Sequence, residues 1–76
     1  MNLGDLLQTR YHHAAVHDSV PLGPVVGHFR ESDMAVVLDV CQLAFEELYV
    51  KVFTSTGVTG WVRRAAVEVV SDVEVR

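Results

Sequence analysis

The chain has 76 residues, of which 50% are hydrophobic, and a formal net charge of -4. A chain of this length supports one modest core, and its acidic balance disfavours a general nucleic-acid binder because the average field repels phosphate. A single cysteine excludes an internal disulfide, which favours a reducing, intracellular environment.

Sixteen valines favour strands over helices, because two heavy atoms on Cβ restrict the χ1 angle. Since no shift in composition marks a linker, residues 1–76 are interpreted as one all-β domain. A turn at Gly4 and Asp5 leads into a short first strand that ends by Arg10. From residue 11 to residue 23, polar residues and proline interrupt any periodicity, which predicts a long N-terminal loop with a functional role.

Two apolar runs follow this loop. Val25–Phe29 and Met34–Val40 are rich in β-branched residues, so each predicts a strand. Residues 42–47 are too few for a stable helix and lack a clear cap, which predicts a loop. Strand character resumes at residues 48–54.

The clearest local signal is a hairpin that begins at Tyr49. Its first strand ends near Thr54, Gly57 supplies the positive φ of a tight turn, and the second strand runs from Val58 to Val62. The next four residues, 63–66, allow a single turn of 3₁₀ helix before a closing strand at 67–70. The alternating residues 72–75 would extend that strand or pair with a neighbour.

The hairpin and the closing strand contain three familiar stretches: Tyr49-Val50-Lys51-Val52, Gly57-Val58-Thr59-Gly60-Trp61-Val62 and Val67-Glu68-Val69-Val70. They resemble bacterial SH3 domains and small phage-encoded SH3-like proteins, and the similarity covers roughly residues 21–70. The resemblance implies a small SH3-like barrel of about five to six short antiparallel strands. Residues 15–21 lack the Asn-Val-Arg-Ser-Gly-Pro-like stretch of that family, so peptidoglycan recognition does not carry over.

A second resemblance is confined to the N-terminal part of the chain. The Gly-Asp start and the stretch Tyr11-His12-His13 are similar to the small SH3-like subunit of ferredoxin-thioredoxin reductase. This likeness implies an accessory subunit of an enzyme complex, without catalytic residues of its own.

Candidate metal ligands and catalytic groups are few. The histidines form one cluster, which consists of His12, His13, His17 and His28. Structural zinc sites usually add cysteines at paired spacings, and Cys41 stands alone, so we interpret the histidines as part of a solvated loop. We expect Cys41 to be buried as a small hydrophobe, and the sequence has neither a nucleophile motif nor an acid–base pair. No catalytic residue, metal, cofactor or small-molecule substrate is therefore predicted.

Trp61 leaves two interpretations open. It either packs in the core or forms a partly exposed platform at the start of a strand, since indole is enriched at binding hot spots. The SH3 resemblance implies a groove formed by Trp61, Tyr11 and the 11–23 loop. Arg63 and Arg64 are interpreted as a solvated turn that is able to contact a carboxylate or a phosphate. The candidate partner-binding residues are Tyr11, His13, Trp61, Arg63 and Arg64.

These features predict a non-enzymatic SH3-like interaction module, phage-encoded by resemblance, that binds a protein through the Trp61 edge and the 11–23 loop. The alternative is a structural subunit, such as a virion decoration or assembly component, which associates with itself or with a larger protein. Neither nucleic acid nor a membrane is expected as a partner. Because the sequence has no signal peptide and no run of about 20 apolar residues, we expect the chain in a bacterial cytoplasm or in a virion.

Overall fold

A computed structural model describes residues 2–20, 23–42 and 48–70 of the chain. In chain order its elements are β1 (Leu6–Thr9), β2 (His13–His17), β3 (Val25–Arg30), β4 (Ala35–Gln42), β5 (Leu48–Thr54), β6 (Thr59–Arg63), the 3₁₀ turn Arg64–Ala66 and β7 (Val67–Val69). The predicted all-β class is confirmed, but seven strands replace the five to six expected. Among the described residues, no helix is long and apolar enough to cross a membrane.

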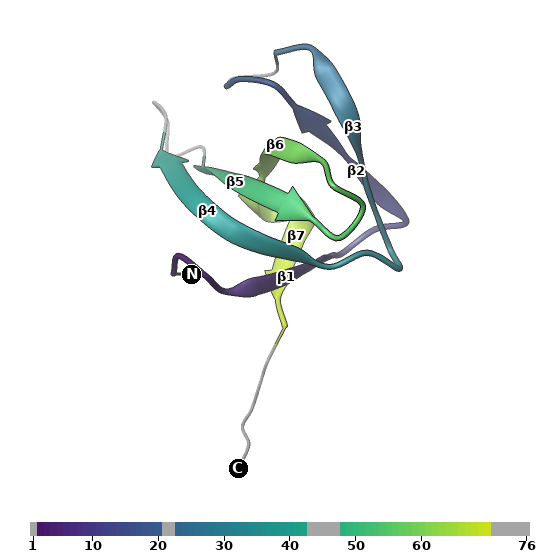
Figure 1. Cartoon of the computed structure of the whole chain (residues 1–76). Coiled ribbons are helices and arrows are strands. Elements are labelled where there is room, and N and C mark those ends of the chain that lie inside the picture. The colour runs from purple at the N-terminus through teal and green to yellow at the C-terminus, as the bar shows by residue number, and fades with distance from the viewer. Residues whose placement is uncertain (1, 21–22, 43–47, 71–76) are drawn as a thin grey trace.

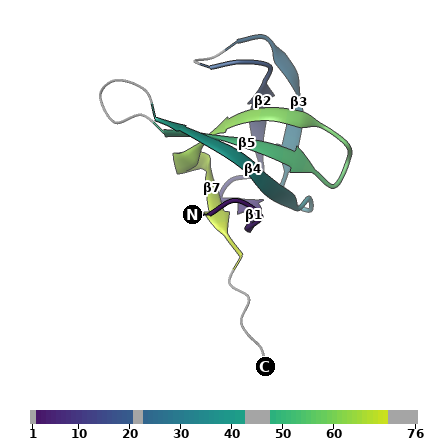
Figure 2. The same ribbon diagram turned by 60° about the vertical axis from the view of Figure 1, so that its left-hand side comes forward.

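The strands form one antiparallel sheet in the order β3-β2-β6-β5-β4-β1-β7. Figure 1 shows that the sheet curls into a half-barrel. In both Figure 1 and Figure 2, β2 and β3 run steeply across the hairpin of β5 and β6. Because successive side chains of a strand point to opposite faces, this curl encloses one face and leaves the other facing outward.

The enclosed face holds the hydrophobic core. Its largest side chains are Phe29 and Leu7, both fully buried, and valines from five strands fill the remaining space. The core cluster consists of Leu7, Val16, Phe29, Ala35, Val37, Val50, Val52, Val62 and Val67. Burial of these apolar groups is the main force that stabilises a sheet of this size.

The long N-terminal loop predicted at residues 11–23 is wrong, because His13–His17 forms β2 and pairs with β3 along its whole length. Alanine and histidine are not strong strand formers, so this strand depends on its neighbours rather than on intrinsic propensity. Ala14 and Val16 face the core, whereas His13, Ala15 and His17 alternate with them on the outer surface.

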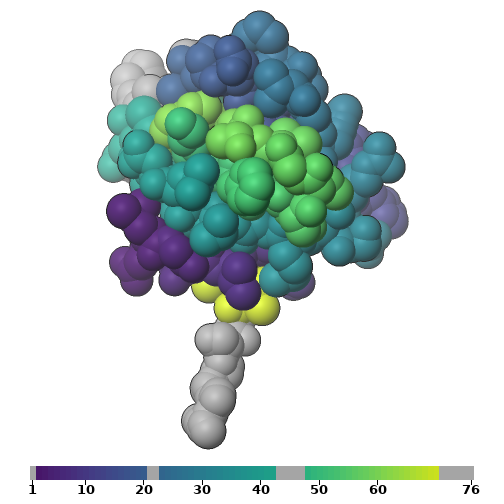
Figure 3. Space-filling model, viewed as in Figure 1, coloured from purple at the N-terminus to yellow at the C-terminus, as the bar shows by residue number. Residues whose placement is uncertain are grey.

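The hairpin, the 3₁₀ turn and the closing strand lie where the sequence predicts them. Gly57 has a φ of +92°, and the hydroxyl of buried Thr54 accepts a hydrogen bond from the Val58 N–H at 3.1 Å. Figure 3 shows this hairpin, in green, at the centre of one face of the molecule. The predicted loop after residue 42 and the alternating tail at 72–75 lie outside the described residues.

Candidate functional site

The outer surface of β3, β2 and β6 carries most of the candidate binding residues. Three cross-strand pairs define it: His13 lies opposite Arg30, Ala15 opposite His28, and His17 opposite Trp61. Arg63 follows Trp61 by two residues on β6 and therefore points to the same side. We call this surface the histidine–arginine face, and it consists of His13, Ala15, His17, His28, Arg30, Trp61 and Arg63.

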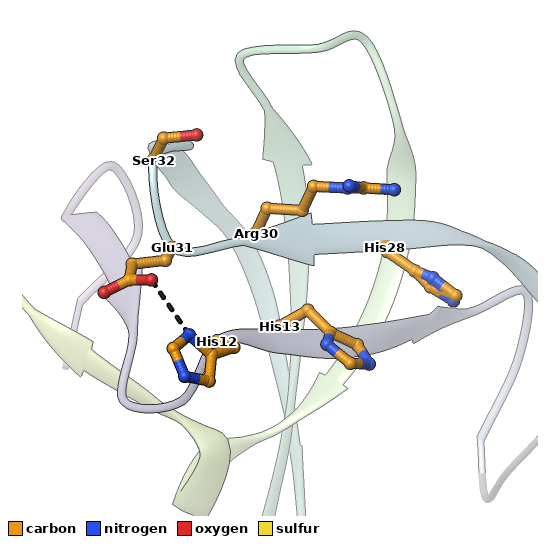
Figure 4. A pocket seen from close by; sticks show the side chains of 6 residues that line it. All are labelled: His12, His13, His28, Arg30, Glu31 and Ser32. Carbon is orange, nitrogen blue, oxygen red and sulfur yellow. Dashed lines mark hydrogen bonds and ion pairs between the residues drawn. The ribbon is translucent and has the colours of Figure 1, made fainter.

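At one end of this face, side chains of β2, β3 and the residues next to them line an open hollow of about 590 Å³. The imidazole rings of His13 and His28 meet edge to face with their centroids 5.4 Å apart. Figure 4 shows the two rings side by side, with the Arg30 side chain extending along β3. Two imidazoles and a guanidinium therefore border this part of the hollow, and Glu31 contributes a carboxylate to its lining.

Two carboxylates near this face have identified partners. Glu31 Oε1 contacts His12 Nδ1 at 3.1 Å, and Asp33 Oδ2 accepts a hydrogen bond from the Arg30 backbone N–H at 3.0 Å. The side chains of His12 and Glu31 are 93% and 71% exposed, so water screens their pairing strongly. In Figure 4 the Ser32 hydroxyl points away from His12, so these two residues do not form a nucleophile–base pair.

A second hollow, of about 190 Å³, continues along the face from His13 toward β6. Its lining consists of His13, Ala14, Ala15, His17, Arg63 and Ala66. His13 borders both hollows, so they form one continuous surface rather than two separate sites. This continuity links the predicted site residues His13 and Arg63, although they are 50 positions apart in the sequence.

Trp61 lies in the middle of β6, between His17 on β2 and Lys51 on β5, and not at the start of its strand. It is half-buried and is not part of the core cluster, so its ring contributes to the outer face. The neighbouring Gly60 allows β2 to cross closely, because a Cβ there would lie 2.6 Å from the His17 carbonyl oxygen. His17 is held in turn by its Nδ1, which lies 2.8 Å from the Gly23 carbonyl oxygen.

Two predicted site residues lie apart from this face. Tyr11 is 62% exposed and precedes β2 at the end away from the His17–Trp61 pair, so the structure does not bring Tyr11 and Trp61 together. Arg64 is half-buried in the 3₁₀ turn, where its Nη1 donates to the Val67 carbonyl oxygen at 3.0 Å. That hydrogen bond gives Arg64 a structural role, whereas the adjacent Arg63 lies on the face.

The histidines and Cys41 do not converge on a common point. Within the part of the chain that the structure describes, no group of three or more histidine, cysteine, aspartate or glutamate side chains is arranged to hold a metal ion. Cys41 lies on β4 opposite Tyr49 and is half-buried, which corrects the expectation of a fully buried thiol. Its position on another strand separates it from the histidine–arginine face.

Four members of the face were not among the predicted site residues: Ala15, His17, His28 and Arg30. Their signal was the alternation of polar or small residues with apolar ones in His13-Ala14-Ala15-Val16-His17 and Gly27-His28-Phe29-Arg30. A period of two places alternate residues on one side of a strand. Applied to both segments, it would have assigned these histidines and Arg30 to the outer surface.

Comparison of the chain with known protein families, curated protein sequences and solved structures finds no match in any of the three. The functional interpretation consequently depends on the geometry of the face itself.

Proposed function

We propose that this chain is a non-enzymatic, SH3-like interaction module that binds a partner protein across the histidine–arginine face. The observation that carries the proposal is the gathering of three histidines, two arginines and a half-buried tryptophan on one continuous outer surface. Tryptophan and arginine are the side chains most enriched at binding hot spots. The adjoining hollows give a partner's side chains places to enter.

Charge distribution supports the same function. The chain as a whole is acidic, with ten carboxylate residues against six lysines and arginines, yet the ionisable side chains of this face are all basic or histidine. Complementary charge raises association rates and orients partners. A protein surface with acidic side chains is the partner that this arrangement fits.

The proposal is tested by affinity capture from cells that naturally contain the chain, with three variants compared by mass spectrometry. We expect Trp61→Ala and Arg30→Gln to lose a protein that the unmodified chain retains, because each removes a contact on the face. Arg10→Gln is the matched control, since it removes the same charge from a residue outside the face. Circular dichroism establishes that each variant is folded.

If Trp61→Ala and Arg30→Gln are folded and retain the same captured proteins as Arg10→Gln, the face is not the binding surface. Loss of folding in Trp61→Ala alone would assign that side chain a structural role. The Arg30→Gln comparison would then decide the question, because Arg30 is exposed and its backbone, rather than its guanidinium, makes the turn contact with Asp33.

A different observation favours the second candidate, a structural subunit that assembles with copies of itself. Leu6, Val36 and Phe53 lie opposite one another across β1, β4 and β5, and Leu6 and Phe53 are 50% and 47% exposed. A contiguous apolar row on an outer surface is typical of a contact between proteins. The oligomeric state in solution separates this candidate from the first.

A further inference from the structure

The centre of the histidine–arginine face is its smallest side chain, Ala15. Along β2 it is flanked two residues away on either side by His13 and His17, and across the sheet it lies opposite His28 on β3. Toward β6, Arg63 follows Trp61, the partner of His17, by two residues and lines the same hollow as Ala15. Four larger, nitrogen-bearing side chains thus surround one methyl group.

This arrangement explains the hollow of about 190 Å³ described above, which we now call the Ala15 hollow. Side chains directly opposite in an antiparallel sheet have Cβ atoms about 4.5–5.5 Å apart, so a large residue at position 15 would fill the space between its neighbours. The methyl group of Ala15 leaves that space open. Ala66, at the end of the 3₁₀ turn, is another small side chain of the lining.

The groups that border the Ala15 hollow suit a carboxylate. The guanidinium of Arg63 presents a planar fork of N–H donors that matches a carboxylate in a bidentate arrangement. Imidazole nitrogens of His13 and His17 lie along the adjacent strand, and His17 is already oriented by the Gly23 carbonyl. Arg63 takes part in no ion pair with another described residue, so none of these residues neutralises its guanidinium.

The charge of the whole chain favours a single carboxylate over a polyanion. A net charge of -4 repels nucleic acid as it approaches, whereas the same charge repels a protein segment with isolated acidic side chains less strongly at long range. A second copy docked symmetrically would place Arg63 and the histidines of both copies against one another, which like charges disfavour.

We infer that the Ala15 hollow binds the side-chain carboxylate of a glutamate or aspartate in a partner protein, an inference that rests on the binding function proposed for this face. Arg63 is the principal contact, and His13 and His17 form the walls. Since the hollow is small and open, it holds one acidic side chain, while Trp61 and Arg30 contact the residues on either side of it.

The test is titration of the ¹⁵N-labelled chain with the peptide acetyl-Gly-Val-Glu-Val-Gly-amide, followed by NMR, with the glutamine analogue as the matched probe. We expect saturable shifts at residues 14–17 and 63 with the glutamate peptide, and at least tenfold weaker binding of the glutamine analogue. Ala15→Leu should abolish the effect, because it fills the hollow and leaves every charge in place. Ala65→Leu adds the same side chain to an exposed position outside the lining and should bind as the unmodified chain does.

Arg63→Gln provides an independent measurement if Ala15→Leu does not fold, and should weaken binding of the glutamate peptide at least tenfold. Unchanged binding by a folded Ala15→Leu chain, equal binding of both peptides, or equal affinity for free acetate would each overturn the inference. The capture experiment with Trp61→Ala and Arg30→Gln is a separate measurement. If those variants lose a partner while Ala15→Leu retains it, the proposed function stands and the Ala15 hollow is not the carboxylate site.

Discussion

At the scale of single residues, two glycines of the same hairpin serve different physical needs. Gly57 adopts a φ of +92° in the turn, and a Cβ there would meet no atom within 4 Å. Gly60 lies on β6, where a Cβ would approach the His17 carbonyl oxygen to 2.6 Å and Val16 Cγ1 to 2.7 Å. The first glycine is required by backbone conformation and the second by close packing of β2 on β6.

These two causes predict different costs for the same substitution. Gly57→Ala should lower the free energy of unfolding by about 1 kcal/mol, because alanine is strained at positive φ but has free space. Gly60→Ala should cost more, up to about 3 kcal/mol, because the added methyl forces β2 away from β6. Urea unfolding of the two variants measures the difference. Equal losses, or a smaller loss for Gly60→Ala, would contradict the close contact between β2 and β6.

The sequence predicts the role of only one of these two glycines. Gly57 stands between two β-rich stretches, and its positive φ follows from local turn chemistry. The steric demand at Gly60 comes from His17, which is 43 residues away in the chain. Contacts between distant segments have no local signature, so the sequence did not indicate this demand.

At the scale of elements, β2 is the strand that decides whether the face exists. If residues 13–17 formed a loop, as the sequence suggested, His13, Ala15 and His17 would not share a surface with β3 and β6. The Glu31 N–H donates to the His12 carbonyl at 2.9 Å, and antiparallel bonding alternates along the pair. The amides of Ala14 and Val16 therefore point toward β3, as hydrogen-bond donors.

Hydrogen exchange measured by NMR tests this strand directly. We expect the amides of Ala14 and Val16 to exchange at least about a hundredfold more slowly than those of the exposed Ser19 and Ser32, because opening them requires separation of β2 from β3. Buried Phe29, opposite Ala14 on β3, should be protected to a similar extent. Rapid exchange at Ala14 and Val16 with protection retained in β5 and β6 would show that β2 is not a stable strand, and would remove the basis of the face.

Elements with a local signal could be predicted from the sequence, whereas strands whose pairing is imposed by tertiary contacts could not. The hairpin, the 3₁₀ turn and β7 follow from valine-rich strands, a turn glycine and a short connection. Segment 13–17 instead contains two histidines and two alanines, which do not favour a strand by themselves. For the same reason, the sequence predicted the candidate site only in part. His13, Trp61 and Arg63 were named as site residues, but Ala15, the small residue between them, was not.

At the scale of the whole molecule, charge and apolar surface lie on different parts of the sheet. The histidine–arginine face covers β3, β2 and β6, whereas the row of Leu6, Val36 and Phe53 crosses β1, β4 and β5. Salt acts on these two surfaces in opposite directions. Screening weakens contacts between exposed charges, and sulfate strengthens burial of apolar surface because it is excluded from the protein surface.

This separation gives a prediction that distinguishes the two candidate functions. We expect the chain to run as a monomer of 8.4 kDa in size-exclusion chromatography with light scattering, both at low ionic strength and in sodium sulfate. Binding of an acidic partner or of the glutamate peptide should weaken as sodium chloride rises from about 0.05 M to 0.5 M, since the Debye length, about 10 Å at 0.1 M, falls about threefold over this range. A stable oligomer that grows in sulfate and is lost in Phe53→Ser would instead assign the chain to the structural class. Phe53 is 47% exposed, so that substitution should alter the oligomer with little effect on the free energy of unfolding of the monomer.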